Sequence, residues 1–192
     1  MADLLQDPLP CGWAPANDTL YRDYHDTEWG VPEYDPRALW EKLQLDGMQA
    51  GLAWITILRK RTSIREEFDG FDPDSIARWD GPRIEKALGN AGIIRSPKKI
   101  EATIGNARTY LDMREAGEDF ADYLWAFMDG KPLVNTWTIW TDAPAKTPLS
   151  EAISKDLKTR GFKFCGPVIV YAFMQAVGMI NDHQIDCPRY QA

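Results

Sequence analysis

The sequence predicts an all-α protein, and two observations lead to this fold class. Apolar residues recur at helical spacing along most of the chain. In addition, several prolines follow an aspartate or a glycine where such a stretch begins, as is typical of the first turn of a helix. No alternating strand series, no G-x-G-x-x-G pattern and no P-loop occurs in the chain.

The first half of the chain predicts helices from their capping residues. Asp35-Pro36 supplies an N-cap and a proline at the first helical position, and apolar residues follow at helical spacing. Gly47 and Gly51 interrupt this helix, and residues 52–60 predict a second helix that ends in basic residues. Two short helices are expected to start at Asp72-Pro73 and Gly81-Pro82.

The second half is also expected to be helical, with one exception. Residues 131–148 contain Thr, Trp and Pro with little periodicity, which predicts an irregular loop with extended character. A turn is expected over residues 90–97. The predicted helices cover residues 98–114, 118–128, 150–160 and 166–178.

The chain has two histidines and three cysteines, and each histidine has a cysteine nearby. Cys11 precedes His25, and Cys187 follows His183 by four residues. Two Cys and two His form the ligand set of a closed structural zinc site, and such an ion would join the two chain ends. The usual tandem C-x2-C signature is absent, so the same residues also fit ordinary buried side chains. Cys165 lies at an apolar helix start and is interpreted as a packing residue.

Length and composition favour one domain, or one domain with a smaller lobe, since 192 residues with 44% hydrophobic content can form a core. No apolar run is long enough to span a bilayer, so we expect no membrane partner. Residues 1–10 hold two Asp and no basic residue, which argues against a signal peptide. Three cysteines without obvious pairing favour a reducing compartment, and we expect a cytoplasmic protein.

The net charge of −7 argues against wrapping nucleic acid, but the distribution of charge matters more than its sum. Basic residues gather at 59–61, 95–99 and 155–163. Each group could form part of a basic face, or could be an ordinary solvated helix end. The chain also has eight Trp. Aromatic rings usually fill cores, but in a pocket they can stack on flat ligands such as bases.

Residues 90–97 have the features of a phosphate-binding helical hairpin. Gly92 permits a positive φ and a close approach of the main chain. Backbone N–H groups at the start of the second helix favour an anion, and Arg95, Lys98 and Lys99 add positive charge beside them. The alternative is a plain hairpin of two helices, which is common in helical proteins.

Several motifs converge on one family in this chain. It resembles the type I 3-methyladenine DNA glycosylases of the helix-hairpin-helix superfamily. The motifs run in order from residue 11 to residue 187 and are specific in combination. They are Cys11-Gly12-Trp13, Tyr21-x2-Tyr24-His25-Asp26-x-Glu28-Trp29-Gly30-Val31-Pro32, Gln49-Ala50-Gly51-Leu52-x-Trp54-Ile55-Thr56, Ala91-Gly92-Ile93-Ile94-Arg95, Ile104-Gly105-Asn106-Ala107, Lys158-x-Arg160-Gly161-Phe162-Lys163-Phe164, Phe173-Met174-Gln175-Ala176 and Asn181-Asp182-His183.

The resemblance implies a monomeric, monofunctional enzyme that removes 3-methyladenine from double-stranded DNA by base flipping, without strand cleavage. It implies one domain over residues 1–192. The terminal segments would form a zinc-stapled lobe, and roughly residues 40–150 would form the helix-hairpin-helix lobe. The implied zinc ligands are Cys11, His25, His183 and Cys187.

The resemblance also implies roles for the aromatic residues and the hairpin. Asp46 and Tyr24 would serve catalysis. The base pocket would consist of Trp13, Tyr21, Tyr24, Trp29, Asp46 and Trp54. Leu52 would enter the duplex as a wedge when the base leaves. Gly92, Ile94, Arg95, Lys98 and Lys99 would contact DNA.

The chain departs from the family pattern at two positions. The family has a Glu where this chain has Asp46, and a Ser where it has Ala53. Asp46 keeps the charge but is one methylene shorter, and a misplacement of about 1 Å can lower a rate on the order of 100-fold. Asp46 could instead be a solvated residue at a helix end. Two other readings therefore stay open: a family member with altered base choice, or a non-catalytic zinc-stapled module that binds damaged DNA.

Overall fold

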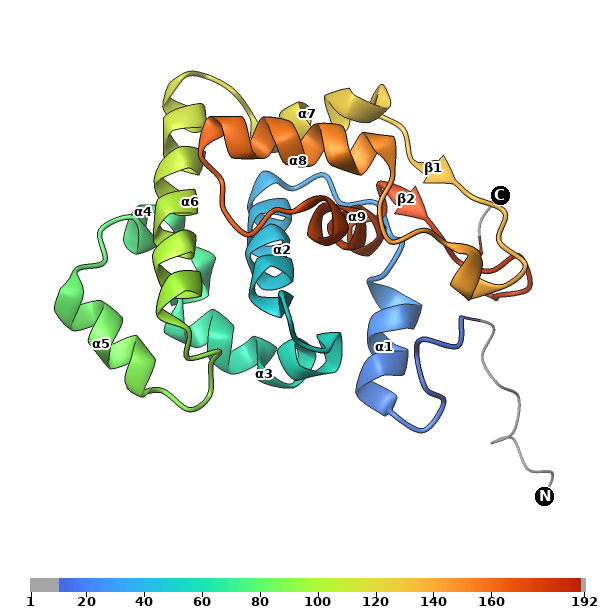
Figure 1. Cartoon of the computed structure of the whole chain (residues 1–192), viewed down its shortest axis with the longest axis horizontal. Helices are drawn as coiled ribbons and strands as arrows, with labels where there is room; N and C mark the ends of the chain where they lie inside the picture. The colour runs from blue at the N-terminus through green and yellow to red at the C-terminus, as the bar shows by residue number, and fades with distance from the viewer. Residues whose placement is uncertain (1–10, 191–192) are drawn as a thin grey trace.

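The computed structural model describes residues 11–190, and these residues form a helical protein with one short two-stranded sheet (Figure 1). The segment in which no signal peptide is expected, residues 1–10, lies outside the described residues. Within residues 11–190, no helix combines the length and the apolar character that crossing a membrane requires. The all-α prediction therefore holds for the main architecture.

The helices follow the predicted order, with one helix that the sequence did not predict, α1. The helices are α1 (Thr19–Thr27), α2 (Pro36–Gln49), α3 (Trp54–Glu67), α4 (Pro73–Ile76), α5 (Gly81–Gly89), α6 (Pro97–Glu115), α7 (Phe120–Trp125), α8 (Pro148–Arg160) and α9 (Pro167–Ala176). Short 3-10 turns cover Asp69–Phe71, Ala126–Met128 and Trp140–Asp142. The strands are β1 (Leu133–Val134) and β2 (Ile180–Asn181).

Side-chain caps explain why the predicted helix starts are correct. The carboxylate of Asp35 accepts hydrogen bonds from the backbone N–H groups of Arg37 and Ala38, at 2.9 and 2.7 Å. Asp72 and Asp80 cap α4 and α5 in the same way. Such a cap satisfies amide groups that have no partner inside the helix, so the information for the helix start is local.

Two helix ends differ from the sequence prediction. Helix α2 continues through Gly47 to Gln49, and α3 continues past its basic residues to Glu67. The cations predicted to end α3 do not mark a helix end, because Arg59 and Arg61 pair with acids from elsewhere in the chain and Lys60 donates to a distant carbonyl. Arg61 forms two hydrogen bonds to Glu28, the longer of them 2.7 Å.

The segment predicted as an irregular loop contains the strand that the sequence did not reveal. Strand β1 pairs in parallel with β2, with Leu133 opposite Ile180. An isolated parallel bridge joins Trp137 to Gln184 further along. A two-residue strand has no periodicity to detect, so only its distant partner defines it. The pairing fixes the C-terminal segment beside residues 133–137.

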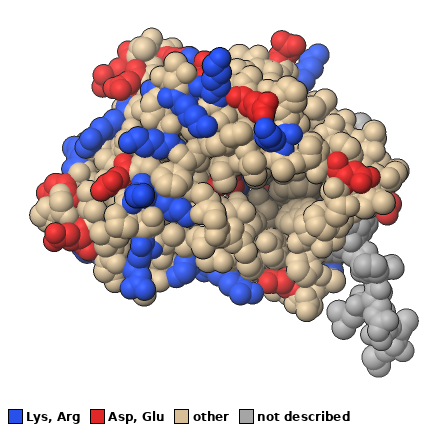
Figure 2. Space-filling model, viewed as in Figure 1, with Lys and Arg blue, Asp and Glu red and all other residues tan. Residues whose placement is uncertain are grey.

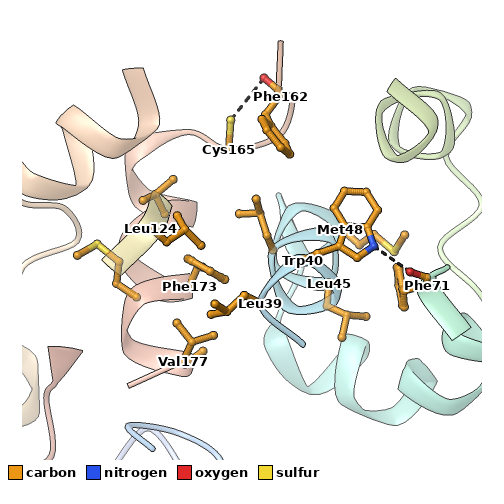
Figure 3. Close-up of a cluster of buried hydrophobic side chains, with 14 of the residues drawn as sticks. Leu39, Trp40, Leu45, Met48, Phe71, Leu124, Phe162, Cys165, Phe173 and Val177 are labelled. Atoms are coloured by element: carbon orange, nitrogen blue, oxygen red, sulfur yellow. Dashed lines mark hydrogen bonds between the residues drawn. The ribbon is translucent and has the colours of Figure 1, made fainter. Parts of the chain in front are cut away.

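The core lies around α2 and α9, which pack against each other near the centre of the molecule (Figures 1 and 3). Leu39 and Leu45 of α2 and Phe173 of α9 are almost completely buried. Trp40 is also buried, and its indole N–H donates to the carbonyl of Phe71 at 2.9 Å.

Cys165 is buried in the same core, as its interpretation as a packing residue predicts, although it lies two residues before α9 rather than in it. One contiguous cluster of buried apolar residues includes members of both chain halves. Figure 1 shows α1 and the strand pair on one side of α2 and α9, and α4, α5 and α6 on the other. The division into a terminal lobe and a lobe of roughly residues 40–150 stays a prediction.

Candidate active site and metal centre

A cavity of 360 Å³ lies between α1, the end of α2, the start of α3, and α9. Five of the six residues predicted for a base pocket line it. The lining residues are Trp13, Tyr24, Trp29, Asp46, Gln49, Trp54, Trp140, Thr141, Ala143, Pro144, Ala172, Gln175 and Asp182. Figure 2 shows a hollow near the middle of the viewed face. The cavity combines flat aromatic walls with two buried carboxylates, which suits a flat ligand that carries positive charge.

The aromatic side chains of the cavity hold one another in place. The rings of Tyr24 and Trp54 are 5.4 Å apart, and those of Trp13 and Trp29 are 4.7 Å apart. The indole N–H groups of Trp13 and Trp54 are buried and have no hydrogen-bond partner. A buried donor without a partner is costly, so these two groups are candidates for contacts to a bound ligand.

Tyr21 is the one predicted pocket residue that does not line the cavity. Its ring packs edge-on against Trp13 at 5.8 Å, so it supports the wall from behind. Trp140 lines the cavity and is 41% exposed, although the sequence assigned it no role. The only sequence feature that could have indicated a role for Trp140 was the high number of Trp residues, eight in this chain. Gln49 and Gln175 lie in the recognised motifs, but nothing in the sequence indicated that they face a cavity.

Asp46 lies near the C-terminal end of α2 and is 2% exposed. This burial excludes the interpretation of Asp46 as a solvated residue at a helix end. Both of its carboxylate oxygens accept hydrogen bonds from the Nζ of Lys42, at 2.7 and 2.9 Å. Burial raises the pKa of the Asp46 carboxyl, and the Lys42 ammonium opposes that rise. Burial likewise lowers the pKa of Lys42, against the effect of Asp46. Each group therefore favours the charged form of the other, against the effect of burial.

Lys42 was not predicted as a functional residue. The available signal was its position four residues before Asp46 in a predicted helix, which places the two side chains on one face. Its ammonium lies 4.0 Å from the centre of the Trp54 ring and 5.8 Å from that of Tyr24. Lys42 thus contacts three of the residues that line the cavity without lining it.

Asp182 is the second buried carboxylate of the cavity, and four neutral donors surround it. One oxygen accepts from Asn135 at 2.6 Å and from the Trp137 indole at 2.7 Å. The other accepts from the Tyr171 hydroxyl at 2.6 Å and from Gln175 at 2.7 Å. These bonds join the loop before α8, helix α9 and the C-terminal segment.

The predicted metal ligands converge next to this cavity. The ligand atoms of Cys11, His25 and Cys187 lie within 4.8 Å of one another, and all three residues are buried. His183 is also buried, and its ring centre lies 4.8 Å from that of His25. The Nε2 atom of His183 has no hydrogen-bond partner. His183 is not one of the three residues whose ligand atoms lie within 4.8 Å of one another, but its unpartnered buried nitrogen would gain a partner from a metal ion at this cluster.

Outer contacts orient the four candidate ligands. The Nδ1 atoms of His25 and His183 lie 2.8 Å from the Asp26 carboxylate and 2.9 Å from the Asn181 amide oxygen. Backbone N–H groups donate to both sulfurs, from Gln184 to Cys11 at 3.4 Å and from Arg189 to Cys187 at 3.5 Å. Such partners commonly fix the orientation of zinc ligands. The residues present therefore fit a zinc ion.

Burial and backbone shape also suit such a site. Burial lowers the pKa of His183 to about 4, which keeps the imidazole neutral and able to bind a metal. Burial, with Cys187 nearby, raises the pKa of the Cys11 thiol to about 12, and only a bound cation would reverse that preference for the protonated form. Gly30 has a φ of +78°, and a Cβ there would lie 2.8 Å from the His183 ring. No other residue could occupy this position without moving that ring.

The predicted hairpin is formed by α5, the turn over residues 90–96, and α6. Arg95 and Lys98 are exposed, and Ile94 is partly exposed. Leu52, the predicted wedge, is an exposed apolar side chain at 40%. Figure 2 shows Lys and Arg side chains gathered over the part of the face that contains α5 and α6. A local basic surface therefore exists on a protein of negative net charge.

Two hairpin residues differ from their predictions. Gly92 is not among the residues with positive φ. It is required for close approach instead, since a Cβ there would lie 3.0 Å from the Cβ of Ser63 on α3. Lys99 directs its ammonium inward, to the carbonyls of Met48 and Ala50 at 2.7 Å each. It thereby caps the end of α2, next to the segment that carries Leu52.

Comparisons with known proteins agree with this geometry. A family model described as methyladenine glycosylase matches residues 13–190. The DNA-3-methyladenine glycosylase of Haemophilus influenzae is 48% identical over 178 residues, which is 93% of this chain and 96% of that protein. The DNA-3-methyladenine glycosylase 1 of Escherichia coli is 49% identical over 180 residues, 94% of this chain and 96% of that protein.

Solved structures give the same result. The structure of 3-methyladenine DNA glycosylase I from Staphylococcus aureus, solved in a study of 3-methyladenine recognition, matches with a TM-score of 0.91 at 34% identity. That match covers 98% of each chain. A crystal structure of 3-methyladenine DNA glycosylase I matches with a TM-score of 0.90 at 49% identity, over 91% of this chain and 96% of the other. The chain therefore belongs to the methyladenine glycosylase family.

Proposed function

We propose that this enzyme hydrolyses the N-glycosidic bond of 3-methyladenine in alkylated double-stranded DNA, as a monofunctional glycosylase of base-excision repair. One observation carries the proposal. The aromatic cavity combines the rings of Tyr24 and Trp54, two unpartnered indole N–H groups and the buried carboxylate of Asp46. Its volume of 360 Å³ is within the range of small-ligand sites and can accept a purine.

The base must leave the duplex before it can reach this cavity. Unstacking costs a few kcal/mol and costs least for a damaged base. Leu52 is the wedge in this proposal, because it is an exposed apolar side chain in the short segment between Gln49 and Trp54, which both line the cavity. The α5–α6 hairpin holds the DNA backbone through Arg95, Lys98 and the positive end of the α6 dipole at its N-terminus. Gly92 and Ile94 shape the turn between the two helices.

Methylation at N3 makes the adenine cationic within the nucleotide, which weakens its bond to the sugar. Aromatic faces attract such a cation by roughly 0.5–2 kcal/mol. Asp46 places negative charge at the floor of the cavity. Burial raises the pKa of Tyr24 well above its ordinary value, so its hydroxyl remains a hydrogen-bond donor.

The reaction breaks the bond between C1′ of the sugar and N9 of the base. Both electrons of this bond go to the base, which leaves as neutral 3-methyladenine. The oxygen of a water molecule bonds to C1′ and releases a proton, and the DNA keeps an abasic site. Closed aromatic walls exclude bulk water from the base and favour its departure.

The Cys and His cluster has a structural role in this proposal, with one zinc ion bound by Cys11, His25, His183 and Cys187. A zinc ion with four protein ligands has no open position for substrate, so it supplies stability rather than chemistry. His25 and His183 pack against Trp29, with the His183 ring centre 4.6 Å from that of Trp29. The cluster thus supports one wall of the cavity.

We also propose that the enzyme works as a monomer in the cytoplasm. All three cysteines are free thiols, as expected in a reducing compartment.

The decisive experiment incubates the purified enzyme with methylated duplex DNA and identifies the released bases by mass spectrometry. We expect 3-methyladenine as the main product, with abasic sites and no strand breaks. Borohydride treatment during the reaction should trap no covalent complex, because the Lys42 ammonium is bound to Asp46 and does not line the cavity. Release of no base would refute the proposed activity.

A further inference from the structure

Two cavities meet at the ion pair of Lys42 and Asp46. Asp46 lines the aromatic cavity, while Lys42 lines a separate cavity of 680 Å³ between α2 and α3. The two side chains are 3% and 13% exposed. The ammonium therefore approaches the carboxylate from the side away from the proposed base site, and it stays out of the aromatic cavity itself.

The pair occupies the atoms that a bound base would need. Both Asp46 oxygens already accept hydrogen bonds from Lys42, at 2.7 and 2.9 Å. The same ammonium lies 4.0 Å from the ring centre of Trp54, so it uses one electron-rich face of that indole. A positively charged base in this cavity would meet a carboxylate whose charge the Lys42 ammonium already offsets. It would also meet an indole ring that the same ammonium already contacts.

Other charged groups lie near the pair, and the acidic residues among them after α1 and on α2 are paired with arginines. Arg61 of α3 is bound to Glu28, which follows α1, and these two charges offset each other. Glu41 of α2 lies beside Arg65 of α3 at 3.4 Å. Across the aromatic cavity, Asp182 is held by four neutral donors, so no cation offsets its charge as Lys42 offsets that of Asp46. The other titratable group that faces the pair is the hydroxyl of Tyr24 from α1.

We propose that Lys42 is a positioning residue that sets base selectivity: it fixes the short Asp46 side chain and offsets its charge, so the pocket discriminates less strongly between cationic and neutral purines. This inference rests on the proposed function, because it concerns the same pocket. It attributes the effect of the shorter Asp46 side chain on base selectivity to its partner, Lys42. An aspartate reaches less far than a glutamate, and Lys42 holds it against α2 by an i,i+4 contact.

The test measures binding of two small probes and requires no DNA. One probe is 3-methyladenine, which is neutral in mildly alkaline buffer. The other is the 3,9-dimethyladeninium cation, which is charged without protonation of a ring nitrogen and has a methyl group where the sugar would be attached. Quenching of the cavity tryptophans reports both dissociation constants. The central variant is Lys42→Met, which keeps side-chain length and removes the charge.

We expect Lys42→Met to raise the affinity for the cation relative to the neutral probe by about tenfold or more, since one unit of positive charge leaves the vicinity of the site. The matched control, Lys155→Met, makes the same chemical change at an exposed site on α8 and should leave the ratio unchanged. An unchanged ratio in a folded Lys42→Met protein would overturn the inference.

The pH dependence separates an electrostatic role from a merely structural one. In the wild type, Lys42 opposes the rise in the Asp46 pKa that burial causes, so cation affinity should change less with pH than in the variant. In Lys42→Met, the Asp46 pKa rises further, because its opposing cation is gone and burial remains. Cation affinity of the variant should therefore increase as pH rises and Asp46 loses its proton. A flat profile in the variant would also count against the inference.

A double-mutant cycle tests whether Lys42 acts through Asp46. In the Asp46→Asn background, Lys42→Met removes an ammonium that no longer has a carboxylate to offset or to position. The selectivity ratio should then change by clearly less than in the wild-type background. An equal change in both backgrounds would show that Lys42 does not act through Asp46. If neither probe binds the wild type at all, the proposed function itself is wrong, which is a separate outcome.

Discussion

The aromatic cavity contains two buried aspartates with opposite surroundings. Asp182, on the wall formed by the C-terminal segment, accepts four hydrogen bonds from neutral side chains of two other segments, the loop before α8 and α9. Asp46, on the wall formed by α2, has one partner, Lys42, from the same helix. A carboxylate that ties distant segments together serves the fold. One that relies on a single local cation can change partners when a ligand arrives, which suits a functional site.

The largest expected effect is a loss of stability when the Asp182 carboxylate is removed from the cavity wall. Asp182→Ala would leave four donors without an acceptor, the buried Tyr171 hydroxyl and three half-buried groups, so we expect a loss of about 3–5 kcal/mol in the free energy of unfolding. Urea denaturation measures this loss. Asp182→Asn keeps one acceptor oxygen and should lose less. If Asp182→Ala is as stable as the wild type, the structural role assigned to Asp182 is wrong.

The metal centre behind the same wall should give the next largest effect. We expect the wild type to carry one zinc per chain and Cys187→Ser to lose it, as mass-spectrometric metal analysis would reveal. Loss of a metal that is present at about 100 times its dissociation constant removes about 2.7 kcal/mol of stability. Cys165→Ser, which alters a buried cysteine outside the cluster, should keep its zinc. Full zinc content in Cys187→Ser would remove this residue from the ligand set.

On the α2 wall, a substitution should affect the reaction more than the fold. Asp46→Asn removes the negative charge at the floor of the cavity, and we expect excision of 3-methyladenine to fall on the order of 100-fold. Single-turnover kinetics on methylated duplex DNA measures this rate. The affinity for that DNA should change little, because Asp46 lies in the cavity and not on the basic surface. Unchanged excision would contradict the role proposed for Asp46.

The smallest effect is expected outside the two walls, on the hairpin. Arg95→Ala removes one exposed cation, so duplex affinity should fall a few-fold, and the slope of log affinity against log salt should become shallower by about 0.9. Titration of labelled duplex at several salt concentrations measures both values. Lys99→Ala should differ, since Lys99 is bonded to the end of α2 and its loss should lower stability more than the salt slope.

Much of the fold could be predicted because its signals are local. An aspartate before a proline satisfies the first amides of a helix whatever the rest of the chain does, which is why α2 and α4 begin where expected. The strand pair could not be predicted, since residues 133–134 have no pattern apart from their pairing with residues 180–181.

For the site, the sequence by itself determined the residue types and the family motifs: the Cys and His set, the aromatic rings and one carboxylate at a known motif position. Only the tertiary structure decided how they are partnered. It placed Tyr21 behind Trp13, bound Asp46 to Lys42 and surrounded Asp182 with donors from residues 135–175. The physical reason is the distance along the chain over which each kind of interaction acts. Caps and motifs act within a few residues, whereas burial and charge pairing depend on segments that only packing brings together.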